Sequence, residues 1–273
     1  MSSDPGVSSY VDISEEAFDI FFSESGRDRK LSGHNWVLQL LLSNAMGTSA
    51  AIRMLATWSR PNEALVLLGT RLEQIFVSSY LVHEEEEKGV KPFVSFLPKI
   101  EDGWNRTLEK IDMTREGIDL LFPEMGAHLP RLIEKIDASA EKSFDFTDGN
   151  FRRKWTGRSL QEIVKRRDEL VDRSDLISSY SLDYYFDTVY RLTGALVHSD
   201  SASISPAFII AGSDGSTRPH EVYVLSSLIV NAHLDIIQCH EISKRLHLLN
   251  EKKYFELYEK YMKRVKLDFS LSE

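Results

Sequence analysis

Proline is scarce in this 273-residue chain, and its eight prolines leave three long stretches uninterrupted. These stretches run over residues 6–60, over 131–205 and from 220 to the C-terminus. Each carries apolar residues at spacings of three and four, the pattern of helices that bury one face. Proline would break such helices, because it lacks an N–H donor and its ring clashes with the preceding turn. The chain is therefore predicted to fold as an all-α helical bundle.

Cap residues and apolar periodicity place the individual helices. Ser14 is expected to cap the first helix, because a serine hydroxyl accepts a bond from a free N–H at a helix start. Pro61 suits the first position of another helix, where a missing N–H costs nothing. A small hairpin or irregular loop is expected near 199–219, which is rich in Ser and Gly. The first predicted helix begins at Ser14. The other predicted helices cover 34–58, 61–84, 160–171, 175–198, 220–250 and 251–266.

No linker rich in proline or glycine divides the chain. We expect N-terminal helices over 1–60 that pack on the core, and a bundle over 61–273 with a peripheral segment at 91–157. The interpretation is one compact domain overall.

Composition narrows the setting. The net charge of −9 argues against a broad electrostatic grip on nucleic acid, although it leaves room for a local basic face. The single cysteine, Cys239, cannot form an internal disulfide. No basic start followed by an apolar run opens the chain, and no stretch long enough to span a membrane lacks charged and strongly polar residues. We expect a cytoplasmic protein without a membrane segment.

The most informative segment for chemistry is YRLTGALVH, residues 190–198. Arg191 and His198 are seven residues apart, so on one helix they share a face at a separation of about 10.5 Å. Arginine binds phosphate oxygens as a planar fork, and histidine transfers protons near neutral pH. Together they suit RNA cleavage by the ribose 2′-hydroxyl, which needs no metal or cofactor. The alternative is a helix end that carries a histidine, with Arg191 in an ordinary ion pair.

Arg71 and Glu73 lie on the most apolar predicted helix, where an unpaired charge is costly. Arg191 or His198 could supply the cation that a buried Glu73 needs, which would bring all four residues into one cleft. The alternative is that Arg71 and Glu73 merely edge the helix and face water.

A basic cluster precedes this element. Phe151 and Trp155 interleave with it, as in surfaces that stack nucleic-acid bases. The alternative is a solvated helix face, on which neighbouring carboxylates balance the basic residues. The candidate nucleic-acid-binding residues are Arg152, Arg153, Lys154, Arg158, Lys165, Arg166 and Arg167.

Sequence motifs for other chemistries are missing. The chain has no GxxxxGK[ST], GxGxxG, HExxH or GxSxG motif, which argues against P-loop, Rossmann, zincin and esterase chemistry. His233, His240 and His247 recur every seven residues, too far apart along a helix for one metal ion. No metal site is predicted.

The segments NEALVLLGTRLEQIFVSSYLV, WTGRSLQEIVKRRDEL and YYFDTVYRLTGALVHSD resemble a bacterial helical family known only as a domain of unknown function. That family has an early Arg-x-Glu helix and a late Tyr-x-x-Leu-type element ending in Val-His. The likeness covers residues 61–250 and implies supporting roles for Arg71, Glu73, Tyr190 and Thr193.

The late element also resembles the Arg-x(4–6)-His signature of HEPN domains. Those are helical bundles, many of them metal-independent ribonucleases of toxin–antitoxin and phage-defence systems, and they commonly form homodimers. The resemblance implies that Arg191 binds phosphate and His198 transfers the proton, with RNA and an antitoxin or defence protein as partners. One departure is Leu192, where active HEPN nucleases usually carry a polar residue. The alternatives are a non-catalytic helical module that binds protein or RNA, and a nucleotide-binding sensor.

Overall fold

The computed structural model of the chain describes residues 5–25, 33–58, 60–90, 92–93, 158–197, 219–248 and 250–270. Every regular element within these ranges is a helix, which confirms the all-α prediction. The elements are α1 (Pro5–Ser25), α2 (Gly33–Thr57), α3 (Pro61–His83), α7 (Leu160–Leu170), α8 (Leu182–Tyr185), the π-helix η1 (Phe186–Tyr190), α9 (Arg191–Val197), α11 (Pro219–Arg245) and α12 (Glu251–Ser270).

The chain divides into two compact units. Residues 1–83 and 160–273 form one unit, and residues 84–159 form the other. The peripheral segment expected at 91–157 falls within the second unit. Helices α2 and α3 lie on either side of the expected boundary at 60, and they pack together in the first unit. The description of one compact domain stays a prediction. The hairpin or loop expected near 199–219 lies, up to residue 218, outside the described residues.

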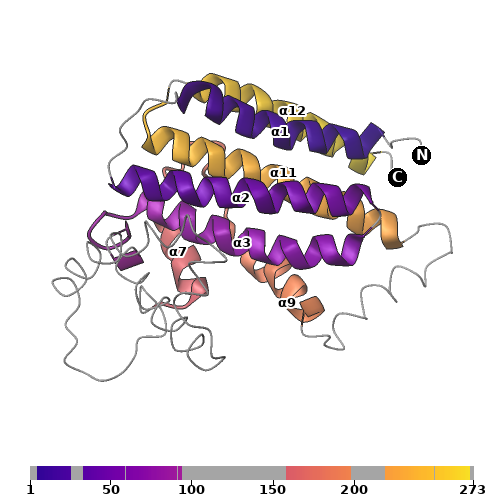
Figure 1. Cartoon of the computed structure of the whole chain (residues 1–273), viewed down its shortest axis with the longest axis horizontal. Helices are drawn as coiled ribbons and strands as arrows, with labels where there is room; N and C mark the ends of the chain where they lie inside the picture. The colour runs from indigo at the N-terminus through magenta and orange to yellow at the C-terminus, as the bar shows by residue number, and fades with distance from the viewer. Residues whose placement is uncertain are drawn as a thin grey trace, which may run out of the picture. The chain divides into compact units, whose positions relative to one another are not determined.

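Helix α11 is the centre of the first unit. It contacts α1, α2, α3 and α12, and α1 and α12 lie side by side on one side of it (Figure 1). Every residue from 231 to 243 is buried, so this stretch has no solvent-facing side. The charged and polar residues that α11 carries there must therefore find partners inside the protein.

The first helix begins earlier than predicted. Helix α1 starts at Pro5, and Ser14 lies in its interior with a fully buried side chain. The prediction was wrong because the Ser14 hydroxyl donates to the Asp235 carboxylate instead of capping a helix start. Helix α2 continues without interruption through Gly47, as the predicted helix over 34–58 requires.

The single helix predicted over 175–198 was also wrong. Residues 172–181 form turns, in which the Asp175 carboxylate accepts bonds from the backbone N–H groups of Ile177 and Ser178. Such side-chain bonds compete with helix formation. Ser181 then caps α8, and η1 separates α8 from α9.

Helix α9 approaches α3 closely at Gly69. A Cβ atom at this position would lie 2.8 Å from Oγ1 of Thr193, closer than real contacts allow. Thr193 is buried there, and its hydroxyl donates to the carbonyl of Tyr190 at 2.8 Å. Gly69 therefore positions the segment that carries Arg191 against α3.

Helix α3 is the one described helix whose length and composition would allow it to cross a membrane. Of its most apolar stretch, 61% is buried within the protein. A central core helix requires the same composition.

Candidate functional site

Arg71 is completely enclosed between α3 and α11. Its Nε and Nη2 atoms donate to Oδ1 of Asp235 at 3.2 and 2.9 Å, and neither side chain has any exposed surface. The other oxygen of Asp235 accepts bonds from the hydroxyls of Ser14 and Ser49. Arg53 donates to both of these hydroxyls at 2.8 Å. One buried carboxylate thus links α1, α2, α3 and α11.

This placement corrects the role expected for Arg71. The sequence suggested that Arg71 supports Arg191 or His198, but its charge is already compensated by Asp235 on α11. Glu73 lies on another side of the same helix and is exposed, because two residues turn a helix by about 200°. Arg71 and Glu73 therefore cannot line one cleft.

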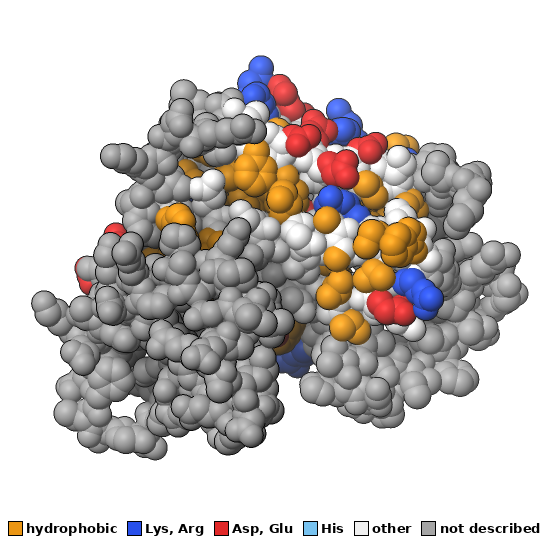
Figure 2. Space-filling view, viewed as in Figure 1, with side chains coloured by type: hydrophobic (Ala, Val, Ile, Leu, Met, Phe, Trp, Pro, Cys, Tyr) orange, Lys and Arg blue, Asp and Glu red, His pale blue; other side chains and the backbone are white. Residues whose placement is uncertain are grey.

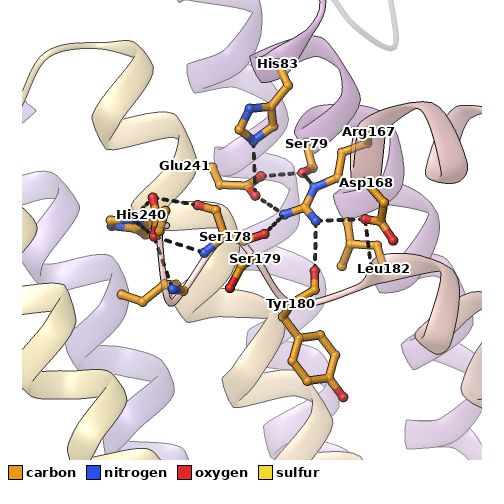
Figure 3. A network of polar contacts seen from close by, with 12 residues as sticks. Ser79, His83, Arg167, Asp168, Ser178, Ser179, Tyr180, Leu182, His240 and Glu241 are labelled. Atoms are coloured by element: carbon orange, nitrogen blue, oxygen red, sulfur yellow. Dashed lines mark hydrogen bonds and ion pairs between the residues drawn. The ribbon is translucent and has the colours of Figure 1, made fainter. Parts of the chain in front are cut away.

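Arg167 on α7 is the second buried guanidinium, at the centre of the network in Figure 3. Its Nε donates to the Ser79 hydroxyl at 2.8 Å. Nη1 donates to Asp168 and to the carbonyl of Tyr180, both at 2.9 Å. Nη2 donates to the carbonyl of Ser178 at 2.8 Å and to Glu241. All five N–H donors of the guanidinium are thereby used.

Glu241 and Asp168 carry the negative charge of this centre. Burial by itself would raise the pKa of Glu241, but Arg167 and His83 lower it to about 2. Nε2 of His83 lies 3.3 Å from the Glu241 carboxylate. Asp168 also accepts bonds from the backbone N–H groups of Leu182 and Asp183 at 3.1 Å. The centre therefore joins α3, α7 and α11 to the start of α8.

Arg167 was predicted to bind nucleic acid, and its burial contradicts that role. Arg167 shares the inner face of α7 with Ile163, Val164 and Asp168. The other described basic candidates differ from it: Lys165 is exposed, Arg158 is partly exposed, and Arg166 pairs with Glu169 at 3.2 Å. Arg152, Arg153 and Lys154 lie outside the described residues.

Arg191 has the opposite environment. Its side chain is 63% exposed and pairs with Asp187, one turn earlier, at 2.9 Å. The guanidinium carbon also lies 5.9 Å from the centre of the Phe186 ring, within the range of a cation–π contact. Arg191 directly follows the π-helix η1. Helices of this kind are rare in proteins, and those that occur are often found at functional sites.

Tyr190 connects this surface to α3. Its hydroxyl donates to Glu73 at 2.5 Å, and burial together with that carboxylate raises the pKa of Tyr190 to about 12. Glu73 thus has a neutral hydroxyl as its partner instead of the predicted cation. His198 lies outside the described residues, so its distance from Arg191 stays a prediction.

Two histidines of the predicted stripe have separate structural partners. Nδ1 of His233 lies 2.7 Å from the Tyr185 hydroxyl, and burial lowers the pKa of His233 to about 3, so its ring is neutral at pH 7. Nε2 of His240 lies 3.0 Å from Asp175. Within the described residues, no three side chains of His, Cys, Asp or Glu are grouped so that they could hold a metal ion.

The carboxylates at the two buried centres were missed by sequence reasoning. The sequence patterns identified neither Asp235 nor Glu241 as the partner of a buried arginine. A signal for them was present, because Arg71 and Arg167 occupy apolar faces of α3 and α7 and each required a buried carboxylate. No rule of helical spacing could indicate which carboxylate that would be.

A family model matches residues 35–216, which is most of the chain and includes both Arg71 and Arg191. That family is described as a family of unknown function, DUF5677. The chain belongs to this family. The predicted likeness to a domain of unknown function is thereby confirmed, whereas the match does not name HEPN. No curated protein and no solved structure matches the chain.

Proposed function

We propose that this DUF5677 protein is a metal-independent endoribonuclease of HEPN type. Arg191 would bind a phosphate of the RNA, and His198 would transfer the proton. The protein would act in the cytoplasm as a toxin or phage-defence effector, as a homodimer and under the control of an antitoxin or other defence protein. The observation that carries the proposal is the exposure of Arg191, which contrasts with the burial of Arg71 and Arg167.

The environment of Arg191 suits an exchangeable ligand. Its partner Asp187 is itself about half exposed, and surface pairs of this kind contribute little to stability. A phosphate could therefore replace the Asp187 carboxylate at low cost. Tyr190 and Glu73 support the segment from the side of α3 without neutralising the guanidinium.

The proposed reaction needs only these two groups and water. His198 accepts the proton of a ribose 2′-hydroxyl while the 2′-oxygen bonds to the adjacent phosphorus. Arg191 binds the non-bridging oxygens and stabilises their growing charge. The bond from phosphorus to the 5′-oxygen breaks, and that oxygen takes a proton from water. The hydroxide left behind takes the proton held by His198, which restores the neutral histidine. The products are a 2′,3′-cyclic phosphate and a 5′-hydroxyl end.

The experiment is cleavage of a mixed RNA pool by the purified full-length chain in excess chelator, with the product ends identified. Arg191→Ala and His198→Ala should each lower the rate by about 100-fold or more. Arg60→Ala is the matched control, because Arg60 is also an exposed arginine in a surface pair, with Glu63. This variant should cleave RNA at the parental rate. Cleavage that persists in His198→Ala would remove His198 from the mechanism.

A non-catalytic module is the second candidate. It is favoured by the fact that Arg71 and Arg167 serve the interior of the bundle and Arg191 already has a carboxylate partner. In that case the chain binds RNA or a protein partner but leaves RNA intact. RNA that is retained in a gel-shift assay without cleavage, with binding weakened by Arg191→Ala, would decide for this candidate.

A further inference from the structure

Helix α2 exposes an apolar face that no described element covers. Four large side chains on it or directly after it have exposed fractions of 48% (Trp36), 45% (Leu40), 46% (Met54) and 63% (Trp58), and Met46 is 37% exposed beside them. The amide of Trp58 bonds to the carbonyl of Met54, so Trp58 continues the turn beyond the end of α2. Two half-exposed tryptophans on one helix are unusual for a surface that faces only water.

These four side chains are arranged symmetrically about Gly47. Trp36 and Trp58 each lie eleven residues from Gly47, and Leu40 and Met54 each lie seven residues from it. Both spacings return a helix to within about 20° of its starting direction. All five positions therefore share one face of α2, with the large residues towards the ends and glycine in the middle.

The centre of this face is open. A Cβ atom added to Gly47 would have no neighbour within 4 Å, and Ser43 and Ala50 beside it are small and exposed. Small residues allow two helices to approach closely where they cross. Figure 2 shows hydrophobic side chains gathered on the side of the molecule that carries α2, with acidic and basic side chains gathered above them.

The charge of this face also suits self-association. Helix α2 contains no Asp, Glu or Lys, and Arg53 is turned inwards to the Asp235 centre with 11% of its side chain exposed. The chain as a whole carries a net charge of −9, so two copies would repel each other across most of their surfaces. An uncharged face avoids that repulsion.

We propose that this α2 face, formed by Trp36, Leu40, Gly47, Met54 and Trp58, binds the same face of a second copy in an antiparallel, two-fold symmetric contact. The two helices cross at Gly47, so that Trp36 packs against Trp58 of the partner and Leu40 against Met54. A two-fold contact requires a surface that is complementary to itself, and the symmetry about Gly47 provides it. The proposal does not depend on the nuclease activity of Arg191 and His198.

The mass of the full-length chain, measured by light scattering over a range of concentrations, tests the contact. Gly47→Lys places a long charged side chain at the crossing, and it should raise the dissociation constant of the dimer by about 100-fold or more. The monomer should fold as well as before, because the site is open and lysine is a better helix former than glycine. Met54→Lys is a second variant with the same expected effect.

The control is Leu267→Lys, which changes an equally exposed apolar residue on α12 and should leave the mass unchanged. A chain that is monomeric at every concentration would overturn the proposal, as would a dimer that Gly47→Lys and Met54→Lys do not weaken. Thermal unfolding of each variant by circular dichroism shows whether a lower mass reflects a folded monomer.

Cross-linking tests the direction of the helices. Gly47→Cys should form a disulfide with its own copy, because facing Cα atoms of closely packed helices come within the 4.4–6.8 Å that a disulfide spans. A mixture of Leu40→Cys and Met54→Cys should give the mixed disulfide and neither symmetric one. Native Cys239 is buried and should not compete. Symmetric Leu40→Cys disulfides would indicate a parallel contact and contradict the proposal.

Discussion

Arg71 and Arg191 make the same kind of ion pair in two opposite environments. Arg71 and Asp235 lie between α3 and α11 without any exposed surface, and hydroxyls from α1 and α2 complete the hydrogen bonds of the carboxylate. Arg191 and Asp187 lie one turn apart on the surface, with about half or more of each side chain in water. The comparison teaches that chemistry alone does not assign a role to an arginine, because burial decides whether its partner can be replaced.

The buried pair should be the most sensitive to mutation. Arg71→Met removes the guanidinium that bonds directly to the buried Asp235 and leaves only Arg53, 4.0 Å away, as its counter-charge. We expect a loss of about 3–5 kcal/mol in the free energy of unfolding. Urea unfolding measures this loss, and Arg60→Ala should change the same quantity by no more than about 0.5 kcal/mol. The double variant Arg71→Met/Asp235→Leu should recover much of the loss, because it removes both of the fully buried charges while Arg53 keeps its pair with Glu15. A loss below about 1 kcal/mol in the single variant would show that the fold does not depend on the buried pair of Arg71 and Asp235.

Acid should weaken the second buried centre. The pKa of Glu241 is lowered from 4.5 to about 2 in the folded protein, so the folded state favours the ionised carboxylate. Its contribution is complete above about pH 4.5, is lost as the pH falls towards 2, and is on the order of 3 kcal/mol. Urea unfolding at pH 5 and at pH 2 should therefore show that Glu241→Gln costs less at the lower pH. Glu63→Gln, which changes an exposed carboxylate, should lower the free energy of unfolding by the same small amount at both pH values. Parallel pH dependences of Glu241→Gln and the parent chain would show that Glu241 is not stabilised in this way.

The surface pair should have the smallest effect on folding. Arg191→Ala removes an exposed pair between the end of η1 and the start of α9, four residues apart, and we expect the free energy of unfolding to fall by about 0.3–0.5 kcal/mol. The same unfolding experiment detects this change, and Asp187→Ala should match it. A loss above about 2 kcal/mol would show that Arg191 supports the bundle and would weaken its assignment to RNA.

Much of the fold could be predicted because helix formation depends on neighbouring residues. The apolar spacing and the N-terminal proline located α3 closely, and α2, α7, α11 and α12 lie near their predicted bounds. Predictions were wrong where a side chain had a distant or competing partner. Ser14 bonds to Asp235 across the bundle, and Asp175 bonds to the backbone and to His240. The spacing of residues along one helix contains no information about such partners.

The sequence by itself determined that the chain forms helices and which face of each is apolar, because both depend on residues within a few turns of one another. Only the tertiary structure decided that Arg71 and Arg167 face inwards to Asp235 and Glu241 while Arg191 faces solvent. Arg71 and Asp235 are separated by 164 residues, and they meet because α3 packs against α11. A buried charge requires a partner, but only the packing of helices selects which residue provides it.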